Sequence, residues 1–260
     1  MSLKNVNRIN GTSFVLYIYI TKTYIVMMMF DPILMVITLV FMGIGMFVSS
    51  RLKSKFSEYS QTPLQKGMSG KEIAEKMLRD NGITDVKITS VEGQLSDHYN
   101  PLTKTVNLSQ EVFEGRSIAS AAVASHECGH AVQHAHAYSW LTLRSAIVPA
   151  VNISSKAMNI IILAGFFLGA IYHWYNQMLL AIIICQGIIT IFSLITLPVE
   201  LDASKRALVW LNNANIARGD EHAKAEDALN WAAKTYFVAA LASLAQLMYF
   251  IMLLVGRRRD

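Results

Sequence analysis

Charged side chains are scarce in this sequence. Lys, Arg, Asp and Glu together make up 16% of its 260 residues, whereas hydrophobic residues make up 53%. Soluble domains average roughly a quarter charged residues, so this composition argues against an ordinary soluble protein. The apolar residues gather into runs long enough to cross a bilayer, which takes about 20 residues of helix. The sequence therefore predicts a membrane protein with a lipid bilayer as its surroundings.

Cysteine is also rare, and we find no basic helix with interleaved aromatic residues. The two cysteines, Cys128 and Cys185, do not suggest a disulfide framework, and both are expected to be small buried hydrophobic residues. Lys and Arg residues that flank membrane spans explain the net charge of +5. We therefore expect no nucleic-acid partner.

Four apolar segments predict a mainly α-helical membrane protein with about four transmembrane helices. A polar segment separates the first span from the second and is expected to form a small inserted α+β unit. The N-terminal extension, to which we assign no function, lacks the small-residue cleavage site of a signal peptide. The expected order is the extension (1–30), transmembrane helix 1 (31–50), the α+β unit (51–145), transmembrane helices 2 and 3 (146–198), a helical segment (199–235), and transmembrane helix 4 with a basic tail (236–260).

The α+β unit is expected to begin with a helix. Ser69 and Glu72 form a capping box, and Gly82 suits the left-handed position after a helix C-terminus. Alternating β-branched residues, an Asn-Pro turn and an Ala-rich stretch of high helix propensity predict three further elements. They are a strand at 85–91, a hairpin at 96–109 and a helix over the Ala-rich stretch 117–135, and because no glycine follows until well after Trp140 we expect no break in this helix near His136.

The Ala-rich helix carries a His-Glu-x-x-His motif. Residues four apart lie on one helix face, so His126 and His130 can present two imidazoles to one metal ion, with Glu127 beside them. Zinc suits these ligands, keeps a position open for water and lowers the pKa of that water to roughly 7. We therefore expect one Zn2+ per chain and a metal-activated water for which Glu127 is the general base. The alternative is that these are ordinary core or surface histidines.

The third metal ligand has several candidates. His134 continues the four-residue spacing, but three ligands along two straight turns do not converge on one tetrahedral ion. His136 has the metzincin spacing, but Gln133 stands where those enzymes need the glycine that breaks the helix. Glu200 and Asp202 lie at the end of the third span, where a carboxylate is costly without a partner. An even number of spans separates them from the motif, so they are expected on the same side of the membrane as the histidines. A solvated helix cap is the alternative for these two carboxylates.

From Met29 to about Val255 the chain resembles the YugP-type family of membrane zinc metallopeptidases. The resemblance rests on "MFDPILM", "SDHYNP", "GRSIASAAVASHECGHAVQHA", "LRSAIVPAVN" and "LPVELDASKRAL". There is a more distant likeness to HtpX-type membrane proteases, whose third zinc ligand is a glutamate on a later helix. The likeness implies a zincin-like unit in which Glu200 is the third ligand and Asp202 orients a ligating histidine. Because "ELDAS" departs from the Glu-x-x-Ala-Asp spelling of the HtpX group, Asp202 stays open as the ligand.

Three further features near the motif are candidates for a functional role. His98 or Tyr99 could stabilise the tetrahedral oxyanion, although packing of the hairpin is the favoured interpretation. Residues 104–109 could form an edge strand to which an extended substrate adds. Arg144 is expected to be an anchor at the membrane interface rather than a catalytic cation.

The expected function is that of a membrane-embedded zinc-dependent endopeptidase acting on peptides or proteins, membrane proteins among them. An intramembrane protease of the site-2 type is an alternative, but Asp202 is followed by Ala203 rather than by glycine. A non-catalytic metal-binding scaffold would not need Glu127. Positive charges flank the spans mainly on the motif side, which predicts a multi-pass cell-membrane protein with a cytoplasmic active site, although residues 257–259 favour the opposite orientation. The oligomeric state stays open.

Overall fold

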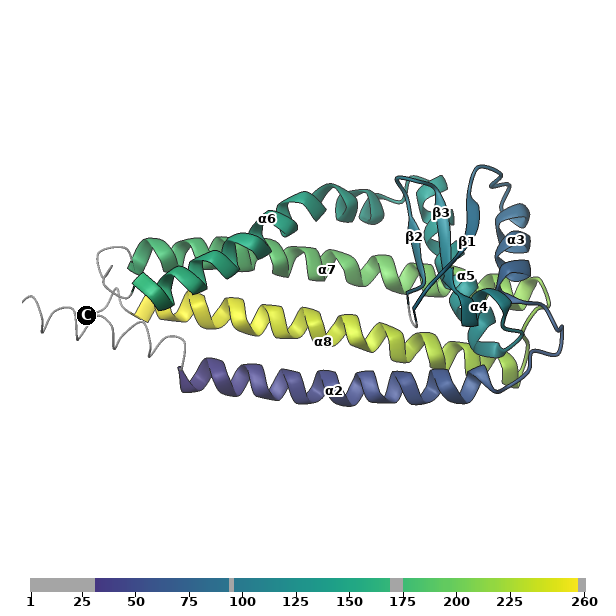
Figure 1. Cartoon of the computed structure of the whole chain (residues 1–260), viewed down its shortest axis with the longest axis horizontal. Coiled ribbons are helices and arrows are strands. Elements are labelled where there is room, and N and C mark those ends of the chain that lie inside the picture. Colours follow the sequence, from purple (N-terminus) through teal and green to yellow (C-terminus); the bar gives the residue numbers. More distant parts are fainter. Residues whose placement is uncertain (1–30, 94–95, 169–174, 257–260) are drawn as a thin grey trace, which may run out of the picture. The chain divides into compact units, whose positions relative to one another are not determined.

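The computed structural model describes residues 31–93, 96–168 and 175–256, so the N-terminal extension and the end of the basic tail lie outside the described residues. The helices are α2 (Pro32–Ser60), α3 (Gly70–Asp80), α4 (Gln110–Glu114), α5 (Ile118–Ala135), α6 (Ser139–Leu168), α7 (Tyr175–Asn213) and α8 (Asp220–Gly256) (Figure 1). The strands are β1 (Lys87–Val91), β2 (His98–Asn100) and β3 (Thr105–Ser109). The protein is a mainly α-helical membrane protein with a small α+β unit, as predicted.

The described residues form two units. The first, the apolar unit, comprises the described parts of Met1–Phe41, Pro149–Ile191 and Leu241–Asp260. The second, the motif unit, comprises Met42–Val148 and Phe192–Ala240 and contains the His-Glu-x-x-His motif. The long helices α2, α6, α7 and α8 each contribute residues to both units.

Among the described residues, four helices are long and apolar enough to cross a membrane, namely α2, α6, α7 and α8, which agrees with the predicted count. Two of them continue past the ends that the apolar runs suggest. α2 extends to Ser60, and α7 passes through Pro198 to Asn213. A proline inside a helix costs one backbone hydrogen bond, and the full burial of Val199 and Ala203 next to it offsets this cost. The part of α7 that follows Pro198 belongs to the motif unit.

The apolar unit has its own buried cluster. Leu179 of α7 packs with Tyr249 and Phe250 of α8. Gln186 Nε2 on α7 donates a hydrogen bond to the Ser243 carbonyl on α8, at 3.1 Å. Hydrogen bonds of this kind between helices are a known source of association within membranes. Apolar packing and polar contacts thus both join α7 to α8 in this unit.

Helix α3 of the motif unit confirms the predicted capping box. Ser69 Oγ accepts the Glu72 N–H, and the Glu72 carboxylate accepts the Ser69 N–H at 2.7 Å. Gly82 follows the helix with a φ of 69°, the left-handed conformation expected of it. The buried Ile73 and Met77 join the core cluster that also contains α5 residues. Local sequence signals therefore place α3, and its apolar face attaches it to the motif helix.

The sheet confirms the predicted hairpin but corrects the expectation of an edge strand. β2 pairs antiparallel with β3, and β1 pairs parallel with β3. The order β1-β3-β2 makes Thr105–Ser109 the central strand, so the expectation that residues 104–109 form an edge was wrong. Parallel strands need a long connection, which residues 92–104 provide, and no local pattern reveals such a pairing. The edge strand that contacts α5 is β2.

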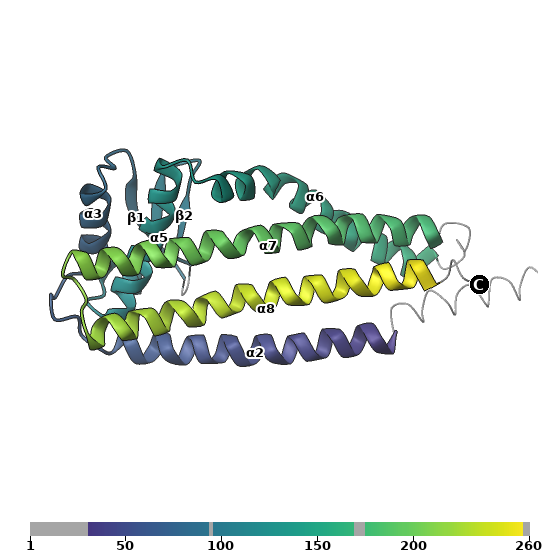
Figure 2. The same cartoon turned by 180° about the vertical axis from the view of Figure 1, so that it is seen from behind.

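The motif helix α5 lies against the C-terminal part of α7 in both views (Figure 1 and Figure 2). Gly129, between the two motif histidines, allows the close approach, because a Cβ there would lie 2.6 Å from the Ala203 carbonyl oxygen. Most side chains of α5 are buried. Cys128 on this helix is buried as expected, whereas Cys185 on α7 is only half-buried. The small side chains of α5 therefore bring the histidines within reach of α7.

Substituting Gly129 tests this close approach. We expect Gly129→Ala to destabilise the protein by about 1–3 kcal/mol, because the added methyl group meets backbone rather than a flexible side chain. Thermal unfolding in detergent measures the loss. Gly187→Ala is the matched control, since a Cβ at that α7 position has no neighbour within 4 Å. Equal melting temperatures for the two variants would contradict the close contact.

Candidate metal centre

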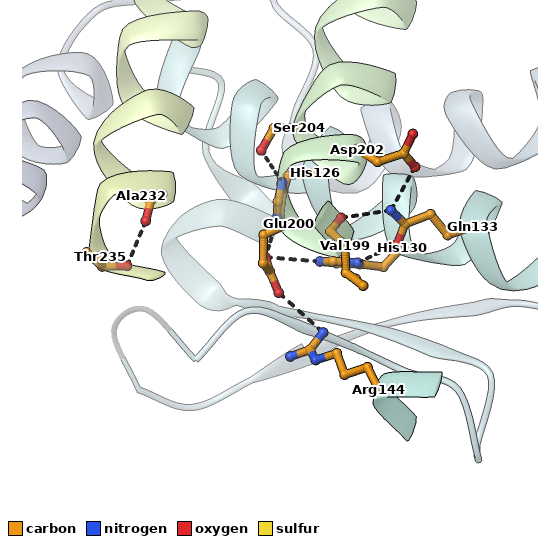
Figure 3. Close-up of polar contacts among 10 residues, drawn as sticks. All are labelled: His126, His130, Gln133, Arg144, Val199, Glu200, Asp202, Ser204, Ala232 and Thr235. Carbon is orange, nitrogen blue, oxygen red and sulfur yellow. Dashed lines mark hydrogen bonds and ion pairs between the residues drawn. The ribbon is translucent and has the colours of Figure 1, made fainter. Parts of the chain in front are cut away.

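Two histidines of α5 and one glutamate of α7 meet in the motif unit (Figure 3). Glu200 Oε2 lies 3.3 Å from His126 Nε2 and 3.5 Å from His130 Nε2. One ligand atom from each of the three residues can be chosen so that all lie within 4.8 Å of one another. The three side chains could therefore hold one metal ion.

Helix geometry explains the convergence. His126 and His130 are one turn apart on α5, with ring centroids 4.8 Å apart and nearly perpendicular planes. Gly129 lies between these histidines on α5, and Ala203 lies about one turn after Glu200 on α7. The close contact between Gly129 and Ala203 therefore brings Glu200 near the histidines. The glutamate is thereby aimed at the imidazole edges, although it follows His130 by 70 positions in the chain.

The donor set fits a catalytic zinc ion. Glu200 is only 3% exposed, and its buried Oε2 has no hydrogen-bond partner. An unpartnered buried carboxylate oxygen is costly, so its place beside two imidazole Nε2 atoms suits a cation. Two histidines and one glutamate are also a ligand set that catalytic zinc uses, with a fourth position left for water.

Gln133 determines which nitrogen of His130 carries the proton. The fully buried Gln133 amide donates to the Val199 carbonyl and to Asp202 Oδ2, each at 2.8 Å. Both amide hydrogens are therefore used, and Gln133 Oε1, 3.1 Å from His130 Nδ1, must accept the ring N–H. This leaves the lone pair on Nε2, the nitrogen that faces Glu200, as a ligand requires.

Asp202 contacts the site indirectly. We expected its carboxylate to orient a ligating histidine, but Asp202 Oδ2 accepts from Gln133 and from Arg206 Nε, the latter at 2.6 Å. The hydroxyl of Ser204, rather than a carboxylate, lies 3.1 Å from Nδ1 of His126. Asp202 therefore reaches a histidine only through Gln133, and the sequence analysis missed the contacts that Gln133 and Ser204 make. The signal in the sequence was an amide side chain one turn after a motif histidine.

The hydrogen bond from His130 to Gln133 can be tested by zinc affinity. We expect Gln133→Met to weaken zinc binding about 10–100-fold, because residues that orient a ligating histidine contribute on this scale. Competition with a chromophoric chelator measures the dissociation constant. His134→Gln is the control one position along the helix, since His134 contacts Tyr99 rather than the candidate ligands. Equal losses in both variants would argue against the specific role of Gln133.

The other two histidines of the motif helix lie elsewhere. His134 Nδ1 is 2.7 Å from the Tyr99 hydroxyl oxygen, and His136 is an exposed residue at the helix C-terminus. We expected no helix break here without glycine, and this was wrong: α5 ends at Ala135, and Ala137 adopts a φ of 49°. The break does not bring His136 into the group of three candidate ligands.

Glu127 lies beside the candidate ligands and is buried. Its side chain lines the same cavity as the two histidines and Glu200. Burial raises the pKa of Glu127 to about 7, while neighbouring His126 opposes the rise. A carboxyl group with a pKa near neutrality can accept a proton as a general base and later release it as a general acid, and hydrolysis needs both transfers.

The cavity has a volume of about 270 Å3 and lies within the motif unit. Its lining includes residues of β2 and its flanks, namely Asp97, His98, Tyr99 and Pro101. It also includes residues of α6, α7 and α8, namely Leu141, Arg144, Ser145, Val148, Phe192 and Tyr236. The cavity therefore combines apolar, aromatic, hydroxyl and charged side chains.

His98 is engaged within the hairpin. Its Nδ1 is 2.8 Å from the Ser96 carbonyl oxygen, so this nitrogen carries the proton and donates. Its Nε2 then accepts from Asn107 Nδ2 at 3.2 Å. In this arrangement the ring has no N–H left for an oxyanion, which agrees with the packing interpretation of His98.

Arg144 contacts the candidate metal centre, which the sequence analysis missed. Arg144 Nη1 lies 3.2 Å from Glu200 Oε1, so the carboxylate faces a guanidinium through one oxygen and the histidines through the other (Figure 3). We expected Arg144 to be an anchor at the membrane interface. A charged residue early in an apolar helix often marks a functional contact, and this was the signal to use.

Comparison with known proteins identifies the family. Residues 34–255 match the family described as "Putative neutral zinc metallopeptidase". The chain is also similar to "Putative membrane protease YugP" of Bacillus subtilis (strain 168), with 38% identity over 224 residues, which cover 86% of this chain and 97% of the relative. No solved structure matches the chain. The match over most of its length shows that the chain belongs to this zinc metallopeptidase family.

Proposed function

We propose that this protein is a membrane-embedded endopeptidase with one zinc ion per chain, held by His126, His130 and Glu200. The observation that carries the proposal is the buried Oε2 of Glu200, which has no hydrogen-bond partner and lies close to the two Nε2 atoms, with buried Glu127 beside them. When bound, zinc polarises the scissile carbonyl and lowers the pKa of a water molecule. The family membership supports this choice of metal.

The residues of the chain have distinct roles in the proposed hydrolysis. Glu127 accepts a proton from the attacking water and delivers it to the leaving amine. Gln133 holds His130 with its Nε2 free, and Arg144 holds Glu200 through Oε1. Arg144 and Tyr236 line the cavity together with Glu200, and they can donate to the carbonyl oxygen as negative charge develops on it.

The substrate in this proposal is an extended peptide segment. β2 is an edge strand, and residues of β2 and its flanks line the cavity, so a substrate backbone can add to this edge. Leu141, Val148 and Phe192 then offer an apolar surface to a substrate side chain. The relative's description as a membrane protease supports peptides and proteins, membrane proteins among them, as the substrate class.

The two alternative functions explain fewer observations. The motif helix α5 is not among the four helices that could span a membrane, whereas a site-2-type protease needs its motif within a span. A metal-binding scaffold needs no carboxylic acid, yet Glu127 lines the cavity. The cationic residues near the motif-side ends of the spans, Arg51, Arg144 and Lys205 among them, favour a cytoplasmic site in the cell membrane.

Cleavage of an unstructured peptide library by detergent-purified protein tests the proposal. We expect internal cuts next to large apolar residues, loss of activity after zinc chelation and recovery on adding one equivalent of zinc. Mass spectrometry of the products locates the cuts. A zinc-loaded, folded protein that cuts no peptide would support the scaffold, and cleavage that survives complete zinc removal would refute the metal-dependent mechanism.

A further inference from the structure

Several cations of the described residues stack on aromatic rings, and most of these cations also have a carboxylate partner. Lys55 pairs with Asp227 at 3.4 Å, Lys71 with Glu75 at 3.7 Å and Arg206 with Asp202 at 2.6 Å. Among the described residues, no carboxylate lies within ion-pair distance of the two that remain, Arg51 and Lys234. These two side chains therefore carry uncompensated positive charge.

The two cations without carboxylate partners lie on one pair of touching rings. The rings of Phe47 on α2 and Trp231 on α8 meet edge to face, with centroids 6.4 Å apart. Arg51 Cζ is 5.8 Å from the Phe47 centroid, and Lys234 Nζ is 3.6 Å from the Trp231 centroid. All four residues belong to the motif unit, where α2 and α8 run side by side (Figure 2). We refer to Phe47, Arg51, Trp231 and Lys234 as the α2–α8 cluster.

The α2–α8 cluster lies at the ends of two apolar helical stretches. Arg51 is the first charged residue after the charge-free stretch 32–50, and Lys234 is the last one before the charge-free stretch 235–256. Tryptophan, lysine and arginine at such ends are typical of the layer where lipid headgroups meet the hydrocarbon core. The cluster is open to its surroundings, since Phe47 is 58% exposed and both cations are exposed.

We propose that the α2–α8 cluster binds the headgroup of an anionic phospholipid. Arg51 and Lys234 would contact the phosphate from two helices, and the exposed Phe47 ring and the half-buried Trp231 ring would support the region between headgroup and acyl chains. The apolar α2 surface that continues from Phe47, with Met46 and Ile44 exposed, offers the acyl chains a contact that a free phosphate ion lacks. A headgroup held in this way would join α2 to α8.

Lipid titration of the detergent-purified protein, followed by native mass spectrometry, tests the proposal. The ligands are phosphatidylglycerol, phosphatidylcholine and inorganic phosphate. We expect Arg51→Gln/Lys234→Gln to bind phosphatidylglycerol about 25-fold more weakly, at about fivefold for each cation near the lipid surface. The matched control is Lys71→Gln/Lys87→Gln, which removes two cations from the motif unit, one of them also stacked on a ring.

The outcomes separate the proposal from its alternatives. Preferential phosphatidylglycerol binding that the double variant loses and the control keeps would support the headgroup site. Equal phosphatidylglycerol affinity in the double variant and the control would overturn it, and so would equally tight binding of phosphatidylcholine. Full competition by inorganic phosphate would indicate a free-anion site instead. If the double variant unfolds, Lys234→Gln alone should still show a fivefold loss, and an unchanged affinity there would overturn the proposal.

Discussion

Glu127→Gln is expected to reduce kcat/KM for peptide cleavage roughly 10²–10⁴-fold, the range that a positioned general base contributes. The amide has nearly the size of the carboxylic acid but cannot accept the proton of the attacking water. The change leaves His126, His130 and Glu200 in place, so zinc binding should remain stoichiometric. Steady-state kinetics on an internally quenched peptide, together with metal analysis of the same sample, measures both effects.

A useful control for Glu127→Gln is Glu111→Gln, an acidic residue exposed on α4 of the same unit and outside the cavity. This variant should keep wild-type activity. A Glu127→Gln protein that binds zinc and retains activity close to wild type would remove Glu127 from the mechanism. Loss of zinc together with activity would instead indicate that Glu127 acts mainly on the metal site.

Glu200→Ala is expected to weaken zinc binding more than about 100-fold, because even residues that only support a ligand contribute 10–100-fold. Glu200 supplies the buried oxygen between the two imidazoles, and no other carboxylate joins that group of three in the described structure. His136→Ala should keep its zinc, since His136 is exposed at the end of α5. Zinc per chain after mild chelation, measured by metal analysis, compares the two variants.

Glu200→Ala also leaves Arg144 without its carboxylate, which could destabilise the fold. Glu200→Gln is therefore included, because its amide oxygen can still accept from Arg144 while the negative charge is lost. Retained zinc in folded Glu200→Ala, with loss of zinc in His136→Ala, would refute the assembled site. The ligands would then all lie on the motif helix and the turn after it.

Local patterns predicted the elements of the motif unit well. The capping box of α3, the hairpin β2–β3 and the helix that carries His126 and His130 all form where their own residues favour them. Each of these features depends on contacts between residues a few positions apart, so a single sequence contains the information. The four apolar helices follow for a similar reason, because their length and composition are properties of single segments.

Contacts between distant segments could not be predicted in the same way. The parallel pairing of β1 with β3 joins strands that are separated by a long connection, and it places β2 rather than β3 at the edge. The end of α5 depends on the left-handed conformation of Ala137, which lacks the glycine that usually marks such a position. Propensity alone gives no reason for either feature, since tertiary packing decides them.

The sequence by itself determined that this is a membrane protein with four apolar helices and a metal-binding motif on a helix, because composition and helical spacing are local. The tertiary structure decided which side chains meet at that motif. The close approach of Gly129 to Ala203 aims Glu200 at the two imidazoles, and Gln133 and Arg144 hold that arrangement through hydrogen bonds and an ion pair. These contacts join residues from three helices, and their geometry exists only after the helices have packed.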